Sequence, residues 1–352
     1  MAAVALPLHR ALLEQQAASS LICGSPPEQK YESVYVAGQG GRGFGALPAY
    51  LFSGLVHIHG LWTPFEWFAH RQAQKHRARL VVSPHGALAP WALAQKRIKK
   101  CVAWHVYQRR MIECADLLIA SSEQEHLQLR GLGLLSPIAI IPNGVEEDST
   151  RLAESGRVER EKIVLFLARL SPAKGVADLL QAWSGLEDRR GYELHIHGFG
   201  DPRYREFLKT QIQTLGLLRD VKLLGPLYGD QKWQKLRSCS VYVLPSYGEN
   251  FGISVAEALR AGLPVITSRA TPWGHLVERR LGWVVDNDVG QLRQALREAI
   301  SLTLTQAQSI GERAREYALQ NFSWPGIAEQ YAKTYAWVRC PTSRKPDWIS
   351  IP

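Results

Sequence analysis

The chain has 352 residues, of which 46% are hydrophobic and 21% charged, so it is long enough for two domains and too apolar to be disordered. No stretch of 18 apolar residues occurs, which excludes a membrane-spanning helix, and the five cysteines lie apart without a CxxC pair, which favours the reducing cytoplasm over a disulfide framework or structural zinc site. The 42 Lys and Arg residues exceed the 32 Asp and Glu residues and give a net charge of +10, which favours an anionic partner.

The first half of the chain alternates predicted helices and strands. Helices are expected over residues 3–16 and 90–110. Apolar, β-branched runs predict strands at residues 20–24, 55–60, 79–86, 116–121 and 138–144. The Gly-rich run 38–45 has no regular strand–turn–helix context, so we interpret it as a loop rather than a phosphate-binding turn.

The positive charge is concentrated in one segment. Residues 67–112 contain ten Lys and Arg residues and no Asp or Glu. Such a segment is either a solvated helix face or a contact for nucleic acid, an anionic membrane or a phosphorylated substrate. Because it resembles no nucleic-acid module, we expect no nucleic acid as partner.

The second half alternates more regularly. Residues 142–162 are polar, without a periodic apolar face, and predict a linker. After it, strands are expected at 162–168, 193–198, 221–225, 241–245, 264–267 and 282–286, and helices at 175–186, 202–215, 230–236, 254–261 and 323–340. This alternation predicts right-handed βαβ units and a doubly wound parallel sheet. The expected domains are residues 1–145, a linker at 146–160, residues 160–322, and a helix and tail at 323–352 that cross back to the first domain.

Ligands of open α/β sheets bind beyond the carboxyl ends of the strands. Arg169 and Lys174 follow one predicted strand, and Gly198 follows the next. Two cations beside glycine-containing turns predict a diphosphate site, because Arg offers a planar fork of donors and Lys a compact charge. The alternative for each cation is a surface ion pair, which is less favoured because both follow the same strand.

Two glutamates form the strongest feature. Glu249 lies on a loop after a predicted strand, and Glu257 lies eight residues, or about two helical turns, further along in the helix that follows. Because that helix is mostly apolar and its sequence is typical of one packed in a core, we expect Glu257 to have a polar partner rather than to be a solvated helix residue. Carboxylates bind vicinal hydroxyls well, so one of the pair suits a hexose and the other a ribose.

These residues lie in segments that resemble a known family. Residues 244–268, LPSYGENFGISVAEALRAGLPVITS, resemble the Glu-x7-Glu donor motif of the family 4 (group 1) retaining glycosyltransferases, which have the GT-B fold. Residues 167–175, LARLSPAKG, are similar to the RL-x-x-x-KG motif of that family. Residues 83–100 and 141–145 resemble its His-Gly segment and its interdomain junction, so the likeness extends from about Leu55 to Trp337.

The resemblance implies an α/β, GT-B fold of two Rossmann-like domains that face a cleft. It also implies a role for each matching residue. Arg169, Lys174 and Gly198 would bind the donor diphosphate; Glu249, Asn250, Phe251 and Gly252 the donor sugar; Glu257 the ribose; His85 and Glu249 would be catalytic; and His59 and Trp62 would lie on the acceptor side. Lys96, Arg97, Lys99 and Lys100 would bind an anionic membrane or acceptor phosphate.

The implied function is transfer of a hexosyl unit from a UDP- or GDP-sugar to a growing, lipid-linked glycan, with retention. The segment PHG-x-L-x-PWAL and the run Thr271–Trp273 resemble the members that build lipopolysaccharide or exopolysaccharide. No cofactor or metal is expected, since the DxD-like Asp286–Asp288 lies late in the domain. We expect a cytoplasmic protein that is peripheral on the inner membrane face.

One departure from the family keeps alternatives open. Members normally begin with a strand, a Gly-rich turn and a helix, whereas this sequence begins at the helix, so the first strand of the N-terminal domain is expected to be missing. The alternatives are a truncated, non-catalytic family member and a sugar-nucleotide epimerase of the same fold.

Overall fold

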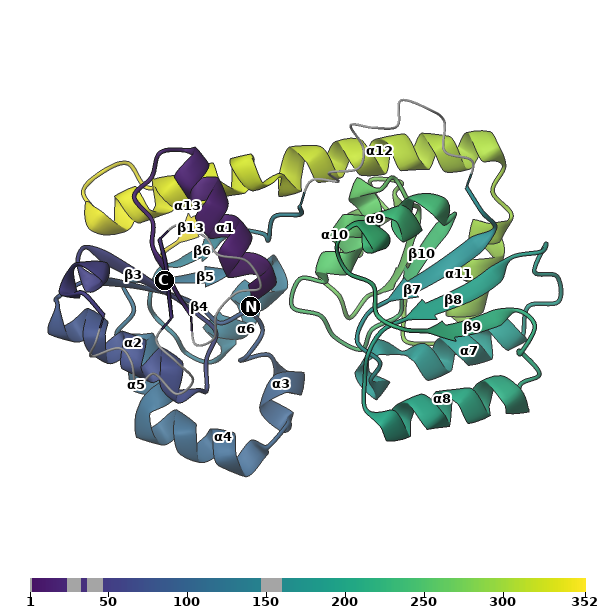
Figure 1. Cartoon of the computed structure of the whole chain (residues 1–352), viewed down its shortest axis with the longest axis horizontal. Coiled ribbons are helices and arrows are strands. Elements are labelled where there is room, and N and C mark those ends of the chain that lie inside the picture. Colours follow the sequence, from purple (N-terminus) through teal and green to yellow (C-terminus); the bar gives the residue numbers. More distant parts are fainter. Residues whose placement is uncertain (1, 24–32, 37–46, 147–159) are drawn as a thin grey trace. The chain divides into compact units, whose positions relative to one another are not determined.

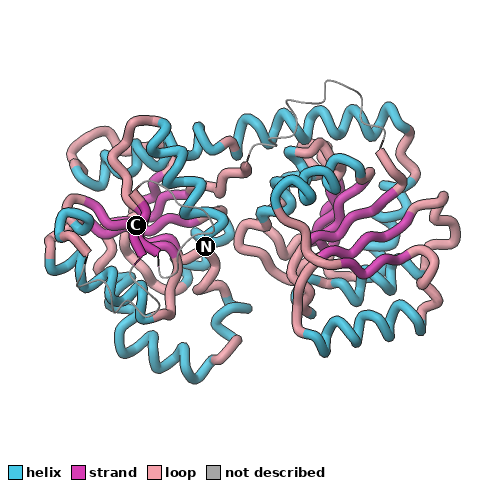
Figure 2. Tube along the Cα trace, viewed as in Figure 1, coloured by secondary structure: helices cyan, strands magenta, loops and turns pink. Residues whose placement is uncertain are grey.

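The computed structural model describes residues 2–23, 33–36, 47–146 and 160–352. The chain forms two compact units, Met1–Gly144 with Trp324–Pro352, and Val145–Ser323. The Gly-rich run 38–45 and most of the predicted linker 146–160 lie outside the described residues. Each unit is a parallel sheet with helices on its faces, as Figures 1 and 2 show.

The second unit contains a six-stranded sheet. Its strands are β7 (Ile163–Leu167), β8 (Glu193–His197), β9 (Val221–Leu224), β10 (Val241–Leu244), β11 (Val265–Ser268) and β12 (Gly282–Val285). Every pair is parallel, and the spatial order is β12-β11-β10-β7-β8-β9. The order therefore reverses between β7 and β10, which is the point where doubly wound sheets bind ligands.

Helices between and after these strands cover both faces of the sheet. They are α7 (Val176–Ser184), α8 (Pro202–Thr214), α9 (Gly229–Ser238), α10 (Ile253–Arg260), α11 (Val289–Ile300) and α12 (Leu304–Phe322), with 3-10 turns at Pro172–Lys174 and Gly274–Leu276. Strands β7 and β10 are buried along their whole length because both sheet faces are covered, which explains their nearly continuous apolar sequences. The six strands predicted in this half are confirmed within a residue or two.

The first unit contains a five-stranded sheet in the order β13-β6-β5-β4-β3. The strands are β3 (Leu55–His59), β4 (Arg79–Ser83), β5 (Leu117–Ala120), β6 (Ile138–Ile140) and the antiparallel β13 (Ile349–Ser350). A separate parallel pair is formed by β1 (Leu21–Cys23) and β2 (Val34–Val36). The first described element is α1 (Ala2–Glu14), so no described strand precedes it.

The two faces of this sheet carry different helices. Alternate residues of β4 and β5 point to opposite faces. Val81 and Leu117 share an apolar cluster with α1 and α13 (Trp324–Arg339), whereas Val82 and Leu118 share another with helices that connect the strands. Those connecting helices include α2 (Pro64–Lys75), α5 (Arg109–Glu113) and α6 (Glu123–Gly131).

The helix predicted over residues 90–110 is wrong as a single helix. The chain forms α3 (Pro90–Ala94), turns at Lys96, and continues as α4 (Arg97–Ala103), a π-helical turn (Trp104–Gln108) and α5. Lys96 has a left-handed φ of 52°, which ends a regular helix. The Lys100 ammonium donates to the Ala92 carbonyl at 2.5 Å across this turn.

Candidate active site

The reversal point of the second sheet brings Lys174 and Glu249 together. Lys174 ends the 3-10 turn after β7, and Glu249 lies on the loop after β10. Their side chains form an ion pair with Lys174 Nζ 2.5 Å from Glu249 Oε1, and both are at most 15% exposed. Arg169 lies directly after β7 and is exposed. A cation and a carboxylate thus meet where a ligand is expected.

Backbone contacts fix the two loops to each other. The Ala173 carbonyl accepts hydrogen bonds from the Tyr247 amide at 2.8 Å and the Ser246 hydroxyl at 3.0 Å. Gly175 has a left-handed φ of 68°, and a Cβ there would lie 2.1 Å from the Pro245 carbonyl oxygen. Only glycine permits this approach, so the KG pair in the motif positions Lys174.

Gly198 serves the neighbouring loop through packing. A Cβ on Gly198 would lie 2.0 Å from the Ala168 carbonyl oxygen. The Leu170 amide donates to the Phe199 carbonyl at 2.7 Å, so the chain after β7 and the chain after β8 run in direct contact. Close packing therefore explains why position 198 is a glycine. The contact of Gly198 with a diphosphate stays a prediction.

Glu257 is buried in α10 and has one partner that the sequence did not reveal. Its carboxylate lies 2.6 Å from the ammonium of Lys232 on α9, and the two side chains are 10% and 17% exposed. Burial raises the pKa of Glu257, and the Lys232 charge opposes that shift. Nothing in the spacing of residues 232 and 257 indicates the pair, because α9 and α10 meet only in the folded unit.

Phe251 and Gly252 form the start of α10. Gly252 has a φ of 75° and precedes the first helical residue. Phe251 is buried against Trp273 and Phe322, and the Trp273 indole donates to the Phe251 carbonyl at 2.5 Å. Trp273 of the Thr271–Trp273 motif therefore holds the loop that carries Glu249 and Asn250.

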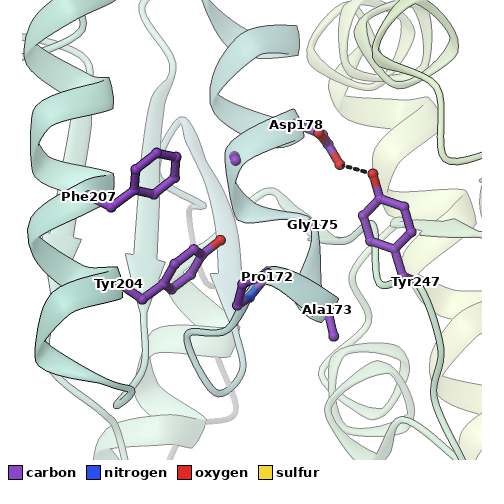
Figure 3. Close-up of a pocket in the computed structure, with 8 residues that line it drawn as sticks. Pro172, Ala173, Gly175, Asp178, Tyr204, Phe207 and Tyr247 are labelled. Carbon is purple, nitrogen blue, oxygen red and sulfur yellow. Dashed lines mark hydrogen bonds between the residues drawn. The ribbon is translucent and has the colours of Figure 1, made fainter. Parts of the chain in front are cut away.

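An apolar cavity of about 650 Å³ lies beside the Lys174 turn. Figure 3 shows Tyr204 and Phe207 of α8 on one side and Tyr247 on the other, with the Tyr247 hydroxyl donating to Asp178 at 2.6 Å. Pro172, Ala173 and Gly175 of the turn also line it. Its volume suits a small molecule, and no motif in the sequence predicts this cavity.

In the first unit, the loop after β4 brings His85 and His59 together. His59 Nδ1 lies 2.9 Å from His85 Nε2, and the rings stack with centroids 5.2 Å apart. The ring of His57 lies 4.0 Å from that of His59 and has hydroxyl partners on both nitrogens, Tyr335 at 2.7 Å and Ser83 at 2.8 Å. Burial lowers the pKa of His57 to about 3 and that of His85 to about 4, so both imidazoles are neutral at pH 7.

A buried carboxylate that no sequence motif indicates holds the turn at His85. Glu125 of α6 accepts hydrogen bonds from the Gly86 amide at 2.6 Å and the Ser121 amide at 2.8 Å. His85 itself has a left-handed φ of 51°, a conformation that costs about 1–2 kcal/mol for a residue with a side chain. Glu125 therefore stabilises a strained turn.

Trp62 is bound to its own unit. Its backbone amide donates to the Gln108 side chain at 3.0 Å, and its indole donates to the Ala87 carbonyl at 3.1 Å. The Lys100 ammonium lies 5.4 Å from the centre of the Trp62 ring. Hydrogen bonds thus hold Trp62 through its backbone and its indole nitrogen, and its acceptor role stays a prediction.

Lys96, Arg97 and Lys99 are exposed, as predicted for a surface contact. Between and after them lies an apolar stripe of Ile98, Val102 and Val106, which are 81%, 59% and 72% exposed. The spacing of four residues places these three side chains on one side of the helix.

Two further observations concern metals and membranes. Among the described residues, no group of three or more His, Cys, Asp or Glu side chains is placed to hold a metal ion. Asp286 pairs with Arg269, and Asp288 caps α11. In the described part of the chain, no helix is both long and apolar enough to cross a bilayer.

Comparison with known proteins identifies the family. The family of glycosyl transferases group 1 matches residues 148–317, and the glycosyl transferase 4-like domain matches residues 6–144. The two matches cover most of the chain, which therefore belongs to the group 1 glycosyltransferases and has the GT-B fold.

Individual relatives are similar to this chain at low sequence identity. The phosphatidyl-myo-inositol mannosyltransferase of Mycobacterium leprae is 33% identical over 62% of this chain and 58% of its own. The structure of Anabaena HepE with UDP-glucose has a TM-score of 0.64 and 24% identity over 80% of this chain and 78% of its own. That of WaaG, a glycosyltransferase involved in lipopolysaccharide biosynthesis, has a TM-score of 0.68 and 15% identity over 94% of both chains. This chain spans about half the length of the curated relatives it matches, from 46% to 59% for three of them.

Proposed function

We propose that this chain is a retaining hexosyltransferase that moves a hexosyl unit from a UDP- or GDP-sugar to a lipid-linked glycan. The observation that carries the proposal is the Lys174–Glu249 pair at the reversal point of the second sheet, with the buried Glu257 on the following helix. Support for the donor class comes from HepE, which binds UDP-glucose.

Each residue has a distinct task in the proposed reaction. Lys174 and Arg169 neutralise the charge that develops on the departing nucleoside diphosphate, Glu249 binds the donor sugar, and Glu257 binds the ribose hydroxyls. Fixed cations of this kind do the work that a metal ion does elsewhere, and losing one such preorganised group costs roughly 2.7–4 kcal/mol of barrier. The His85 imidazole is neutral at pH 7, so it can form a hydrogen bond with the transferred sugar without adding charge to the site.

The acceptor is proposed to be lipid-linked for two reasons. The mycobacterial relative is named for a phosphatidyl-linked acceptor, and WaaG is named for lipopolysaccharide biosynthesis. The second reason lies in this chain, where Lys96, Arg97 and Lys99 flank the exposed stripe Ile98, Val102 and Val106. Basic and apolar side chains on one exposed helix suit the interface of an anionic bilayer, so we propose peripheral binding to the inner membrane face.

A thermal-shift screen tests the donor site. UDP, GDP and ADP are added to the wild type and to Lys174→Ala, with Lys209→Ala as a control that removes an exposed lysine paired to Glu206. A nucleotide at 100 times its Kd adds about 2.7 kcal/mol of stability, which is a shift of a few degrees. We expect a shift with one nucleotide that is lost in Lys174→Ala and kept in Lys209→Ala.

The outcomes separate the proposal from its rivals. A cooperative melt that no nucleotide shifts would favour the non-catalytic family member. If a nucleotide binds, incubation of the UDP- or GDP-sugar with and without acceptor distinguishes the remaining two, because an epimerase converts the donor alone and a transferase needs the acceptor.

A further inference from the structure

The Lys232–Glu257 ion pair is a feature of the donor site that neither the motifs nor the relatives assign. Lys232 lies in the first half of α9, and Glu257 lies near the middle of α10. Their charged atoms are 2.6 Å apart, and the Glu257 side chain is 10% exposed. An ionised carboxylate at this depth requires a partner, since burial without one costs several kcal/mol.

The surroundings of Glu257 would otherwise favour its protonated form. Glu146 adds a second negative charge from the segment that enters the unit, and Tyr242 of β10 is buried nearby. Lys232 is the cation that opposes the effects of burial and of Glu146 on the pKa of Glu257. Its own ammonium is held over the ring of the adjacent Trp233, 5.5 Å from the centroid.

The state of this carboxylate matters for the ligand. Two vicinal hydroxyls donate two hydrogen bonds, and an ionised carboxylate accepts both, whereas a carboxylic acid carries a proton on one oxygen and accepts less well. A nucleoside therefore binds best to the ionised form.

We infer that Lys232 is a positioning residue of the donor site, which keeps Glu257 ionised and aimed so that it accepts hydrogen bonds from the two ribose hydroxyls at neutral pH. This inference rests on the proposed function, because it assumes that Glu257 faces a ribose. Lys232 acts through Glu257 and need not touch the nucleotide.

Calorimetric titration across pH 5.5–9 tests the inference with UDP or GDP, whichever shifts the wild type. Wild-type affinity is expected to change less with pH across this range than the affinity of Lys232→Met. In Lys232→Met the pKa of Glu257 rises further, so affinity should be lower by about tenfold or more at pH 7 and should recover as the pH rises. Nucleotide binding by this variant at pH 7 should also release one proton, which comes from the Glu257 carboxyl. Titrations in buffers of different ionisation enthalpy measure this release.

Three variants complete the design. Lys232→Arg should restore the wild-type profile, because a cation returns to Glu257. Lys235→Met removes a lysine one turn further along α9 and should leave the profile unchanged. Glu257→Gln should bind weakly at every pH, and adding Lys232→Met to it should cause no further loss.

Each contrary result has a definite meaning. If Lys232→Met melts like the wild type and binds with the same pH profile, the inference is wrong while the proposed function stands. If it loses affinity equally at all pH values, or weakens Glu257→Gln further, then Lys232 contacts the nucleotide directly and the positioning role is overturned. If the wild type binds no nucleotide, the proposed function fails and this inference with it.

Discussion

At the residue scale, three carboxylates with low exposure differ in the partners that they have. Glu249 and Glu257 each face one lysine, so their charges are compensated and available at the reversal point of the sheet. Glu125 differs because its carboxylate accepts hydrogen bonds from the backbone amides of Gly86 and Ser121. The first two suit binding of hydroxyl groups, and the third suits support of the turn at His85.

Glu125→Gln should destabilise the first unit. The amide keeps the size of the side chain but replaces one accepting oxygen with a donor, so the Gly86 or Ser121 amide loses its acceptor inside the protein. An unsatisfied buried donor costs about 1–3 kcal/mol, which urea unfolding followed by circular dichroism would measure. Glu123→Gln is the matched control, because Glu123 is on the same helix with a side chain that is 67% exposed; equal stability of both variants would contradict the role of Glu125.

Some residue-level predictions could be made from sequence and others could not. Lys174 and Glu249 lie at predicted strand ends of one sheet, the edge where ligands of parallel sheets bind, and the structure brings their side chains into an ion pair. The pairing of Lys232 with Glu257 depends on how α9 and α10 pack, and no periodicity encodes that. The role predicted for Lys96, Arg97, Lys99 and Lys100 at an anionic membrane or acceptor phosphate stays a prediction. What the sequence did not indicate is the turn at Lys96, which brings the Lys100 ammonium to the Ala92 carbonyl and the Trp62 ring.

At the element scale, the close contact of the loops after β7 and β8 depends on a glycine, which has no side chain. Gly198→Ala would place a Cβ 2.0 Å from the Ala168 carbonyl oxygen, and the backbone must shift to relieve it. Such overpacking costs typically about 1–3 kcal/mol. We expect a lower unfolding midpoint and weaker nucleotide binding, because Arg169 and Lys174 follow the displaced chain.

The control for this variant is Gly225→Ala on the loop after β9. A Cβ there meets nothing within 4 Å, so the substitution should be nearly neutral in urea unfolding and in nucleotide titration. If the two variants unfold at the same urea concentration, the close approach at Gly198 is not what stabilises these loops.

Whole strands and helices were predicted well where their apolar runs were nearly continuous or their sequences were long. The buried strands of the second unit, such as β7 and β10, read as apolar runs because helices cover both faces. The two-residue β13 and three-residue β2 were not predicted, because strands that short have no detectable alternation of apolar and polar residues. The break at Lys96 was missed because a left-handed lysine has no sequence signature.

At the scale of the whole molecule, the distribution of charge is uneven. The ten Lys and Arg residues between Trp67 and Ile112 equal the net excess of +10. The structure adds that Ile98, Val102 and Val106, beside three of those cations, are 59–81% exposed. Basic side chains without an apolar face would suit any polyanion. Basic side chains beside an exposed apolar face suit an anionic bilayer.

Vesicle co-sedimentation tests this proposal. The double variant Arg97→Glu with Lys99→Glu should lose at least about 30-fold in affinity for vesicles rich in phosphatidylglycerol, since each basic residue near such a surface contributes about 1 kcal/mol. Ile98→Asp should weaken binding as well, and the loss should persist at high salt, where the electrostatic part is screened. Neutral phosphatidylcholine vesicles should bind all forms poorly.

A second double variant separates a local surface from net charge. Arg203→Glu with Arg219→Glu changes the charge by the same amount at two exposed sites of the second unit, and it should bind vesicles like the wild type. Equal losses in both double variants would mean that only the net charge acts. Wild-type binding by Arg97→Glu with Lys99→Glu would remove the basic helix from the proposed membrane contact, and the acceptor would then have to reach the enzyme by another surface.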